Sequence, residues 1–217
     1  MHIIEGIMAG TVHGREILAV GMAATAAGTA LGLYKMDHER IPQVGVLSSA
    51  FFVASLIHVP LGPTSEHLVL GGLMGLVLGW AAFPAILVAL LLQAVFFSFG
   101  GLTTLGLNTL IMALPAVCCH YLFRRAACSH REPVVFAAGF AAGATAIALA
   151  GLLNAAALVA AGESFRELGP LVLLCHPPIA LVEGLITGSV VVLLRKVRPE
   201  VLEAPLLVPA AKEVLHG

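Results

Sequence analysis

Charge is the scarcest feature of this sequence. Only 11% of its 217 residues are Asp, Glu, Lys or Arg, whereas 59% are hydrophobic and the mean hydropathy is +1.02. A soluble domain carries about 25% charged residues. The net charge of −1 also gives no sign of nucleic-acid binding. The shortage of charge predicts an integral membrane protein, and long apolar runs without alternation predict helices rather than a barrel.

Several motifs are absent as well. There is no GxxxxGK(S/T), which argues against ATP hydrolysis by a P-loop, and no HExxH, which disfavours an intramembrane zinc protease. The N-terminus has no basic region, and Glu5 interrupts its first apolar stretch, so we expect no cleavable signal peptide. No CxxC spacing occurs, and we expect buried thiols rather than disulfides or a zinc site at Cys118, Cys119, Cys128 and Cys175.

Long apolar runs are what the sequence has instead. A spanning helix needs about 20 mainly apolar residues. The candidate segments are residues 17–34, 44–59, 68–80, 84–99, 107–123, 134–161 and 168–194. The third is short, so we expect it to tilt little or to cross only part of the bilayer where protein surrounds it.

These segments predict an all-α membrane protein with about seven transmembrane helices, its N-terminus outside and its C-terminus cytoplasmic. We expect one domain at residues 1–198, made of an N-terminal metal-binding segment at 1–16 and a helical bundle at 17–198. A short cytoplasmic tail would follow at residues 199–217.

The orientation follows from the basic residues, which mark cytoplasmic connections. They cluster after the first, fifth and seventh segments: Lys35, Arg40, Arg124, Arg125, Arg131, Arg195, Lys196 and Arg198. With seven crossings these clusters fall on one side, with Arg15 as a mild exception. The N-terminus and the loops at 60–67 and 100–106 then lie together outside.

Small residues recur at four-residue spacing, which lets helix backbones approach closely. There are four such ridges: the alanines Ala19, Ala23 and Ala27; the glycine pair Gly28 and Gly32; the glycines Gly71, Gly75 and Gly79; and the glycine pair Gly139 and Gly143. They favour packing within this chain, or docking of a separate membrane subunit. The alanine ridge of the first segment is our docking candidate.

The dipeptide Met1-His2 has a specific chemical capacity. The α-amine of Met1, the backbone nitrogen of His2 and its imidazole Nδ1 close five- and six-membered chelate rings around one metal ion. A fourth nitrogen, such as that of His67, would complete a plane, which suits Ni(II) or Cu(II). A chance histidine near the N-terminus is the simpler alternative.

Polar residues in or beside the spans are further candidates, because they are costly in a bilayer. Glu183 lies mid-span, and we expect it to pair with a histidine, with Asn108 or with the surroundings of a bound cation. For His120 and His176 hydrogen-bonded packing is the simpler interpretation. The loop at 100–106 is either a cap that enters the membrane or a flexible linker.

Four motifs occur in order: MHIIEG at residues 1–6, HVPLGPTSEHL at 58–68, FGGLTTLG at 99–106 with Asn108, and Glu183-Gly184 with Thr187-Gly188. Together they resemble the CbiM/NikM family, the nickel and cobalt substrate-binding (S) components of energy-coupling factor transporters. The sequence departs from the family pattern at residues 7–10, which leaves the path of that segment open.

The resemblance implies a seven-helix S component whose metal is held by Met1, His2 and His67. Supporting or gating candidates are His58, Ser65, Glu66, Thr103, Asn108 and Glu183. It also implies three kinds of partner: a transmembrane coupling subunit, a pair of ATPase subunits and often a small additional membrane protein.

We therefore expect a non-enzymatic subunit of an ATP-driven importer in the plasma membrane of a prokaryote, with Ni²⁺ or Co²⁺ as transported substrate. Three alternatives stay open: a cobalt-specific component for cobalamin synthesis, a metal-gated channel, and an intramembrane enzyme with a catalytic ion at His58, His176 and Glu183. Catalysis needs an open coordination position for substrate or water, and four nitrogens in one plane leave no strong one.

Overall fold

The structure is a computed structural model, and it describes residues 2–3, 8, 10–11, 13–56, 58–61, 64–162 and 168–203. The main helices are α1 (Gly14–Lys35), α2 (Ile41–Ala54), α3 (Gly71–Leu78), α4 (Ala82–Phe97), α5 (Leu105–Ala127), α6 (Glu132–Ala161) and α7 (Leu168–Val197). Short helical turns are η1 (His38–Arg40), η2 (Gly79–Ala81) and α8 (Glu200–Glu203). Each predicted segment corresponds to one of α1–α7, which confirms the all-α membrane fold.

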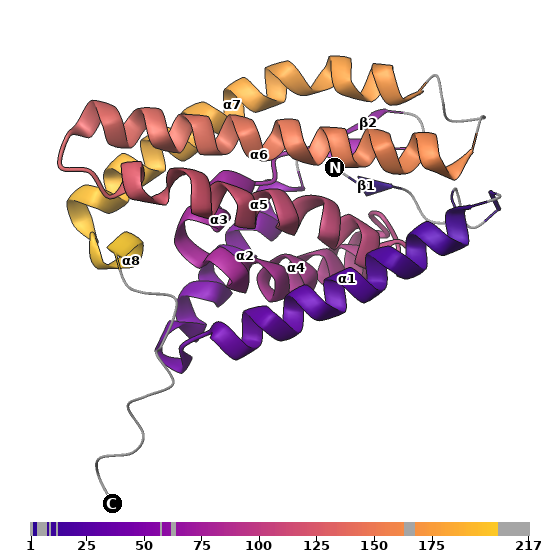
Figure 1. Ribbon diagram of the computed structural model, residues 1–217, viewed down its shortest axis with the longest axis horizontal. Coiled ribbons are helices and arrows are strands. Elements are labelled where there is room, and N and C mark those ends of the chain that lie inside the picture. Colours follow the sequence, from indigo (N-terminus) through magenta and orange to yellow (C-terminus); the bar gives the residue numbers. More distant parts are fainter. Residues whose placement is uncertain are drawn as a thin grey trace, which may run out of the picture.

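Among the described residues, five helical segments are long and apolar enough to cross a membrane. They are α1, the segment formed by the successive helices α3 and α4, then α5, then α6, and the greater part of α7. Consecutive main helices run in opposite directions along the bundle (Figure 1). The starts of α1, α3, α5 and α7 therefore lie toward one end of the bundle, and the basic residues that follow α1, α5 and α7 lie toward the other. That the end with the starts of α1, α3, α5 and α7 faces outside stays a prediction.

Three short strands form an antiparallel sheet that the sequence did not predict. They are β1 (His2–Ile3), β2 (His58–Leu61) and β3 (Thr64–His67), in the order β1-β3-β2. The predicted second span at 44–59 was wrong at its end, because α2 stops at Ala54 and Val59 belongs to β2. Pro60 explains why the helix does not continue to Val59, since the residue before a proline is driven to an extended conformation.

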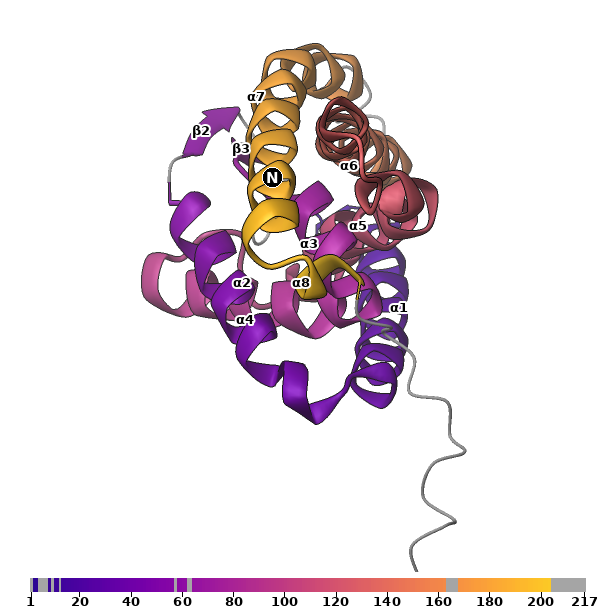
Figure 2. The same cartoon turned by 90° about the vertical axis from the view of Figure 1, so that its left-hand side faces the viewer.

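Helix α3 lies at the centre of the bundle (Figure 2). All its residues are buried, which confirms that the third segment is a short helix surrounded by protein. Two glycines make this possible. A Cβ at Gly75 would lie 2.0 Å from the carbonyl oxygen of Ala116, and one at Gly72 would lie 2.4 Å from the nitrogen of Gly143. Larger residues would push α3 away from α5 and α6.

Helix α1 lies at the periphery and has two distinct faces. Its glycines point inward: a Cβ at Gly28 would lie 2.5 Å from the ring of Phe83. The glycine ridges thus pack within the chain. The alanine ridge of Ala19, Ala23 and Ala27 is exposed instead. The glycine ridge of α1 therefore faces the bundle, and its alanine ridge faces outward.

The cysteines are free, as predicted. Only Cys119 is buried, however, so the prediction of buried thiols was wrong for Cys118, Cys128 and Cys175, which are half-buried. The predicted tail begins with α8, where Leu202 is buried and its carbonyl accepts a hydrogen bond from the thiol of Cys128 at 3.6 Å. The first residues of the tail thus pack against the bundle.

Candidate metal centre

The sheet brings the N-terminal strand beside the strand that ends in His67. In the antiparallel register His2 lies opposite Ser65, and His58 lies opposite His67. His2 is therefore paired with a position two residues before His67, although 65 residues separate the two histidines. Met1 and the side chains of His2, His58, Ser65 and Glu66 lie outside the described residues.

The His67 ring is buried at 3% exposure, and its Nδ1 lies 2.8 Å from the carbonyl oxygen of Leu68. A carbonyl only accepts, so Nδ1 carries the proton and Nε2 carries the lone pair. The edge of the ring meets Phe51, with centroids 6.1 Å apart. A ring nitrogen that donates to a carbonyl fixes the tautomer of a metal-binding histidine in this way.

Asn108, in the first turn of α5, holds the residue that follows His2. Its Oδ1 accepts a hydrogen bond from the Ile3 amide at 2.9 Å, and its Nδ2 donates to the Ile3 carbonyl at 3.2 Å. Nδ2 also donates to Thr104 Oγ1 at 3.2 Å. Because Asn108 and Ile3 are both buried, these bonds fix the backbone of β1 against α5. The sequence singled out Asn108 but missed Thr104, which nothing distinguished from its neighbour Thr103.

Glu183 holds the chain that follows His67. Its Oε1 accepts hydrogen bonds from the backbone amides of Val69 and Leu70, the latter at 2.8 Å. Leu70 has φ of +51°, a conformation that non-glycine residues rarely adopt. The described hydrogen bonds of this buried carboxylate therefore go to a turn of the backbone, whereas the sequence suggested a histidine, Asn108 or a cation. Through this turn α7 fixes where β3 ends and α3 begins.

The remaining candidates lie elsewhere. His120 Nδ1 donates to the Gly75 carbonyl at 3.0 Å, and the buried His176 packs against Gly151. Thr103 is exposed in the turn before α5. Within the described part of the chain, no three His, Cys, Asp or Glu side chains are grouped so that they could hold a metal ion.

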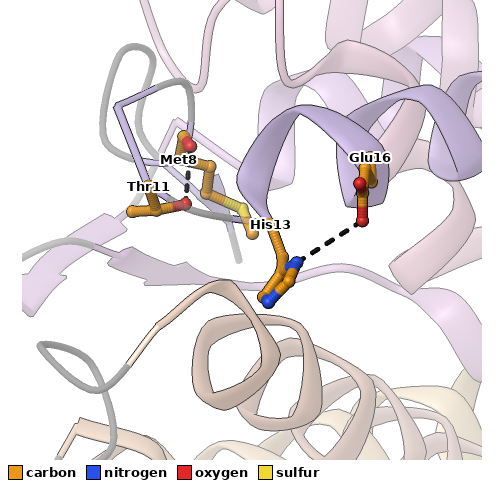
Figure 3. A network of polar contacts seen from close by, with 4 residues as sticks. All are labelled: Met8, Thr11, His13 and Glu16. Carbon is orange, nitrogen blue, oxygen red and sulfur yellow. Dashed lines mark hydrogen bonds and ion pairs between the residues drawn. The ribbon is translucent and has the colours of Figure 1, made fainter.

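The connection from β1 to α1 contains the segment that departs from the family pattern. Met8 is fully buried, and its carbonyl accepts a hydrogen bond from Thr11 Oγ1 at 2.8 Å (Figure 3). His13 and Glu16 follow as an exposed pair 3.5 Å apart (Figure 3), which contributes little to stability. Met8 is thus the hydrophobic anchor of this connection.

Comparisons with known proteins agree with this architecture. The chain is 43% identical over 208 residues to a "Putative metal transport protein" of Haemophilus influenzae, covering 93% of this chain and 97% of that one. It is 33% identical to a fused nickel transport protein, NikMN, of Rhodobacter capsulatus, covering 98% of this chain and 67% of the relative. It is 30% identical to the cobalt transport protein CbiM of Sorangium cellulosum, and the match covers 94% of this chain and 95% of the relative.

A solved structure of a truncated transition metal transporter has the same fold, with a TM-score of 0.72 at 23% identity over 90% of this chain and 99% of that one. The family model described as the cobalt uptake substrate-specific transmembrane region, CbiM, matches residues 2–201. This chain therefore belongs to the CbiM family of transmembrane components for nickel and cobalt transport.

Proposed function

We propose that this protein is the substrate-binding component of an energy-coupling factor importer and captures Ni²⁺ at its N-terminus. The ligands are the α-amine of Met1, the amide and imidazole nitrogens of His2, and the imidazole of His67. The pairing of β1 with β3 carries this proposal, because it puts the backbone of His2 next to the strand of His67. The sheet end of the bundle faces outside, where the metal is captured.

The described geometry supports the role of His67 in particular. Its Nδ1–H bond to Leu68 leaves the lone pair on Nε2, the form of imidazole that binds a metal. The amide of His2 must lose its proton to bind, and the charge of the metal lowers the pKa of such groups. Metal binding therefore releases protons and weakens as the pH falls.

Cobalt is the second candidate, because the matching family model describes cobalt uptake while relatives are named for nickel or for cobalt. Four nitrogens in one plane favour Ni(II), although the affinity order puts Co(II) only slightly lower. An absorption spectrum of the loaded protein separates the two. A yellow band typical of planar nickel supports our choice.

Transport requires partners, since the sequence has no P-loop of its own. In the proposed complex a transmembrane coupling subunit docks on the alanine ridge of α1, and ATPase subunits drive reorientation. The exposure of Ala19, Ala23 and Ala27 supports this surface. Ala23→Leu should leave nickel binding unchanged and impair uptake with the full set of subunits. Unchanged uptake would move the docking surface elsewhere.

The decisive experiment concerns the α-amine. One Gly added before Met1 turns the amine into an amide and displaces the terminal nitrogen of the chelate. We expect calorimetry to show a loss of tight nickel binding, while a C-terminal tag of similar size changes nothing. Equal affinity in both proteins would exclude the α-amine as a ligand, and the site would then need His2, His67 and a third side chain.

A further inference from the structure

The end of the bundle opposite the sheet (Figure 1) is hollowed. A cavity of about 470 Å³ opens between the C-terminal ends of α1 and α5 and the turn η2. Lys35, Arg124 and Arg125 line it, and its described lining residues include no Asp or Glu. Three cationic side chains from two helices thus converge on a hollow to which the described lining brings no carboxylate.

The aromatic wall of this cavity is fixed in place. Trp80 Nε1 donates to the hydroxyl of Tyr121 at 2.8 Å, and the Trp80 ring stacks on Phe83 with centroids 5.9 Å apart. The Lys35 ammonium lies 5.2 Å from the centroid of the Trp80 ring. Trp and Tyr are enriched where a membrane protein meets the headgroups. Trp80 and Tyr121 are therefore the residue types expected in a cavity at headgroup level.

Positive charge is crowded in this region. Arg40, in η1 just beyond α1, has a pKa below its ordinary value, mainly because it is partly buried and secondly because Arg124 is near, while Asp37 acts in the opposite direction. A bound anion would relieve this repulsion. An anion with several acceptor oxygens matches a cluster of Lys and Arg donors best.

We propose that this cavity binds the phosphate of an anionic phospholipid. A phosphodiester carries the required charge and acceptors, and basic pockets between transmembrane helices suit lipid headgroups. The surroundings favour a lipid over a soluble phosphate, because the cavity continues onto exposed apolar side chains. Leu122, which lines the cavity, is 64% exposed, and Leu31, the residue before the lining residue Gly32 on α1, is 41% exposed. These residues contact the acyl chains while the cations hold the headgroup.

Trp80 makes the proposal directly testable, because it is the only tryptophan in the sequence. The full-length protein in detergent is titrated with phosphatidylglycerol bearing brominated acyl chains, which quench tryptophan at short range. Brominated phosphatidylcholine serves as the zwitterionic lipid, and unlabelled glycerol 3-phosphate as the soluble phosphate. We expect strong quenching by the anionic lipid, weak quenching by the zwitterionic lipid, and no competition from glycerol 3-phosphate.

A pair of double variants then locates the site. Lys35→Gln with Arg125→Gln removes two cavity charges, and Arg131→Gln with Arg198→Gln removes two charges at the same end but outside the cavity. At roughly 1 kcal/mol per basic residue near an anionic lipid, the first pair should weaken phosphatidylglycerol binding by about 30-fold and the control far less. Circular dichroism verifies that both variants keep their helices.

Three results would overturn the proposal. Equal quenching by both lipids would show a surface without selectivity for the headgroup. Competition by glycerol 3-phosphate would identify a site for soluble phosphates. Equal weakening of phosphatidylglycerol binding in both double variants would show only a diffuse attraction to the basic end of the bundle. The comparison of lipids on the unaltered protein decides the question even where a variant fails to fold.

Discussion

His67 and His120 are two buried histidines with nearly the same local geometry. Each donates its Nδ1 proton to a backbone carbonyl, His67 to Leu68 at 2.8 Å and His120 to Gly75 at 3.0 Å. Their surroundings differ. His67 ends a strand that pairs with the N-terminal strand, whereas His120 lies on α5 beside Tyr121 and close to the basic cavity. A fixed tautomer is therefore not enough to single out a metal ligand, and our proposal for His67 rests on the strand that lies beside it.

The largest effect on nickel binding should come from replacing His67, with the same substitution at His120 as its matched control. We expect His67→Ala to lower nickel affinity by more than about 100-fold, since it removes a proposed ligand rather than a supporting group. His120→Ala should leave nickel affinity unchanged within error. Calorimetry on the purified proteins measures both. Equal losses in the two variants would mean that the histidines act through the fold rather than through coordination.

Asn108 tests whether the position of β1 matters for the site. Asn108→Ala removes both hydrogen bonds to Ile3 and should lower nickel affinity by about 10- to 100-fold, the usual range for groups that orient a ligand. Asn108→Asp keeps an acceptor for the Ile3 amide and loses the donor to its carbonyl, so we expect an intermediate affinity. An Asn108→Ala protein with full affinity would show that β1 is positioned without this contact.

Glu183 tests the other flank of the site, the turn that follows His67. Glu183→Ala leaves the buried amides of Val69 and Leu70 without their acceptor, which costs about 1–3 kcal/mol for each group. We expect a lower unfolding temperature and an about tenfold weaker nickel affinity. Glu183→Gln keeps an acceptor oxygen and should retain most of both. If Glu183→Gln loses as much stability and nickel affinity as Glu183→Ala, the negative charge itself is needed, and Glu183 does more than hold this turn.

The smallest effect on metal binding is expected at His120, where stability should respond instead. His120→Ala removes the side-chain donor to the Gly75 carbonyl, which keeps the Gly79 amide as its other donor, so we expect a cost of about 0.5–1.5 kcal/mol for this bond. The unfolding temperature should fall while the affinity of the folded protein for nickel stays constant. A His120 variant with normal stability but weak nickel binding would reverse the comparison with His67.

The amino-acid sequence by itself determined the membrane class and the approximate position of all seven main helices. Apolar runs and helix formation are local properties, so they are readable one segment at a time. The sequence also marked His2, His67, Asn108 and Glu183 as candidates, through the chelating capacity of an N-terminal histidine and through a family resemblance that spans nearly the whole chain.

Only the tertiary structure decided how these candidates are connected. The sheet has strands of two and four residues, too short and too interrupted by Pro60 and its neighbours to give a periodic signal. The contact of Asn108 with Ile3 spans 105 residues, and that of Glu183 with Leu70 spans 113. Such pairings depend on the packing of α5 and α7 around the buried α3. A buried polar group takes whichever partner the packed backbone supplies, and no local pattern encodes that choice.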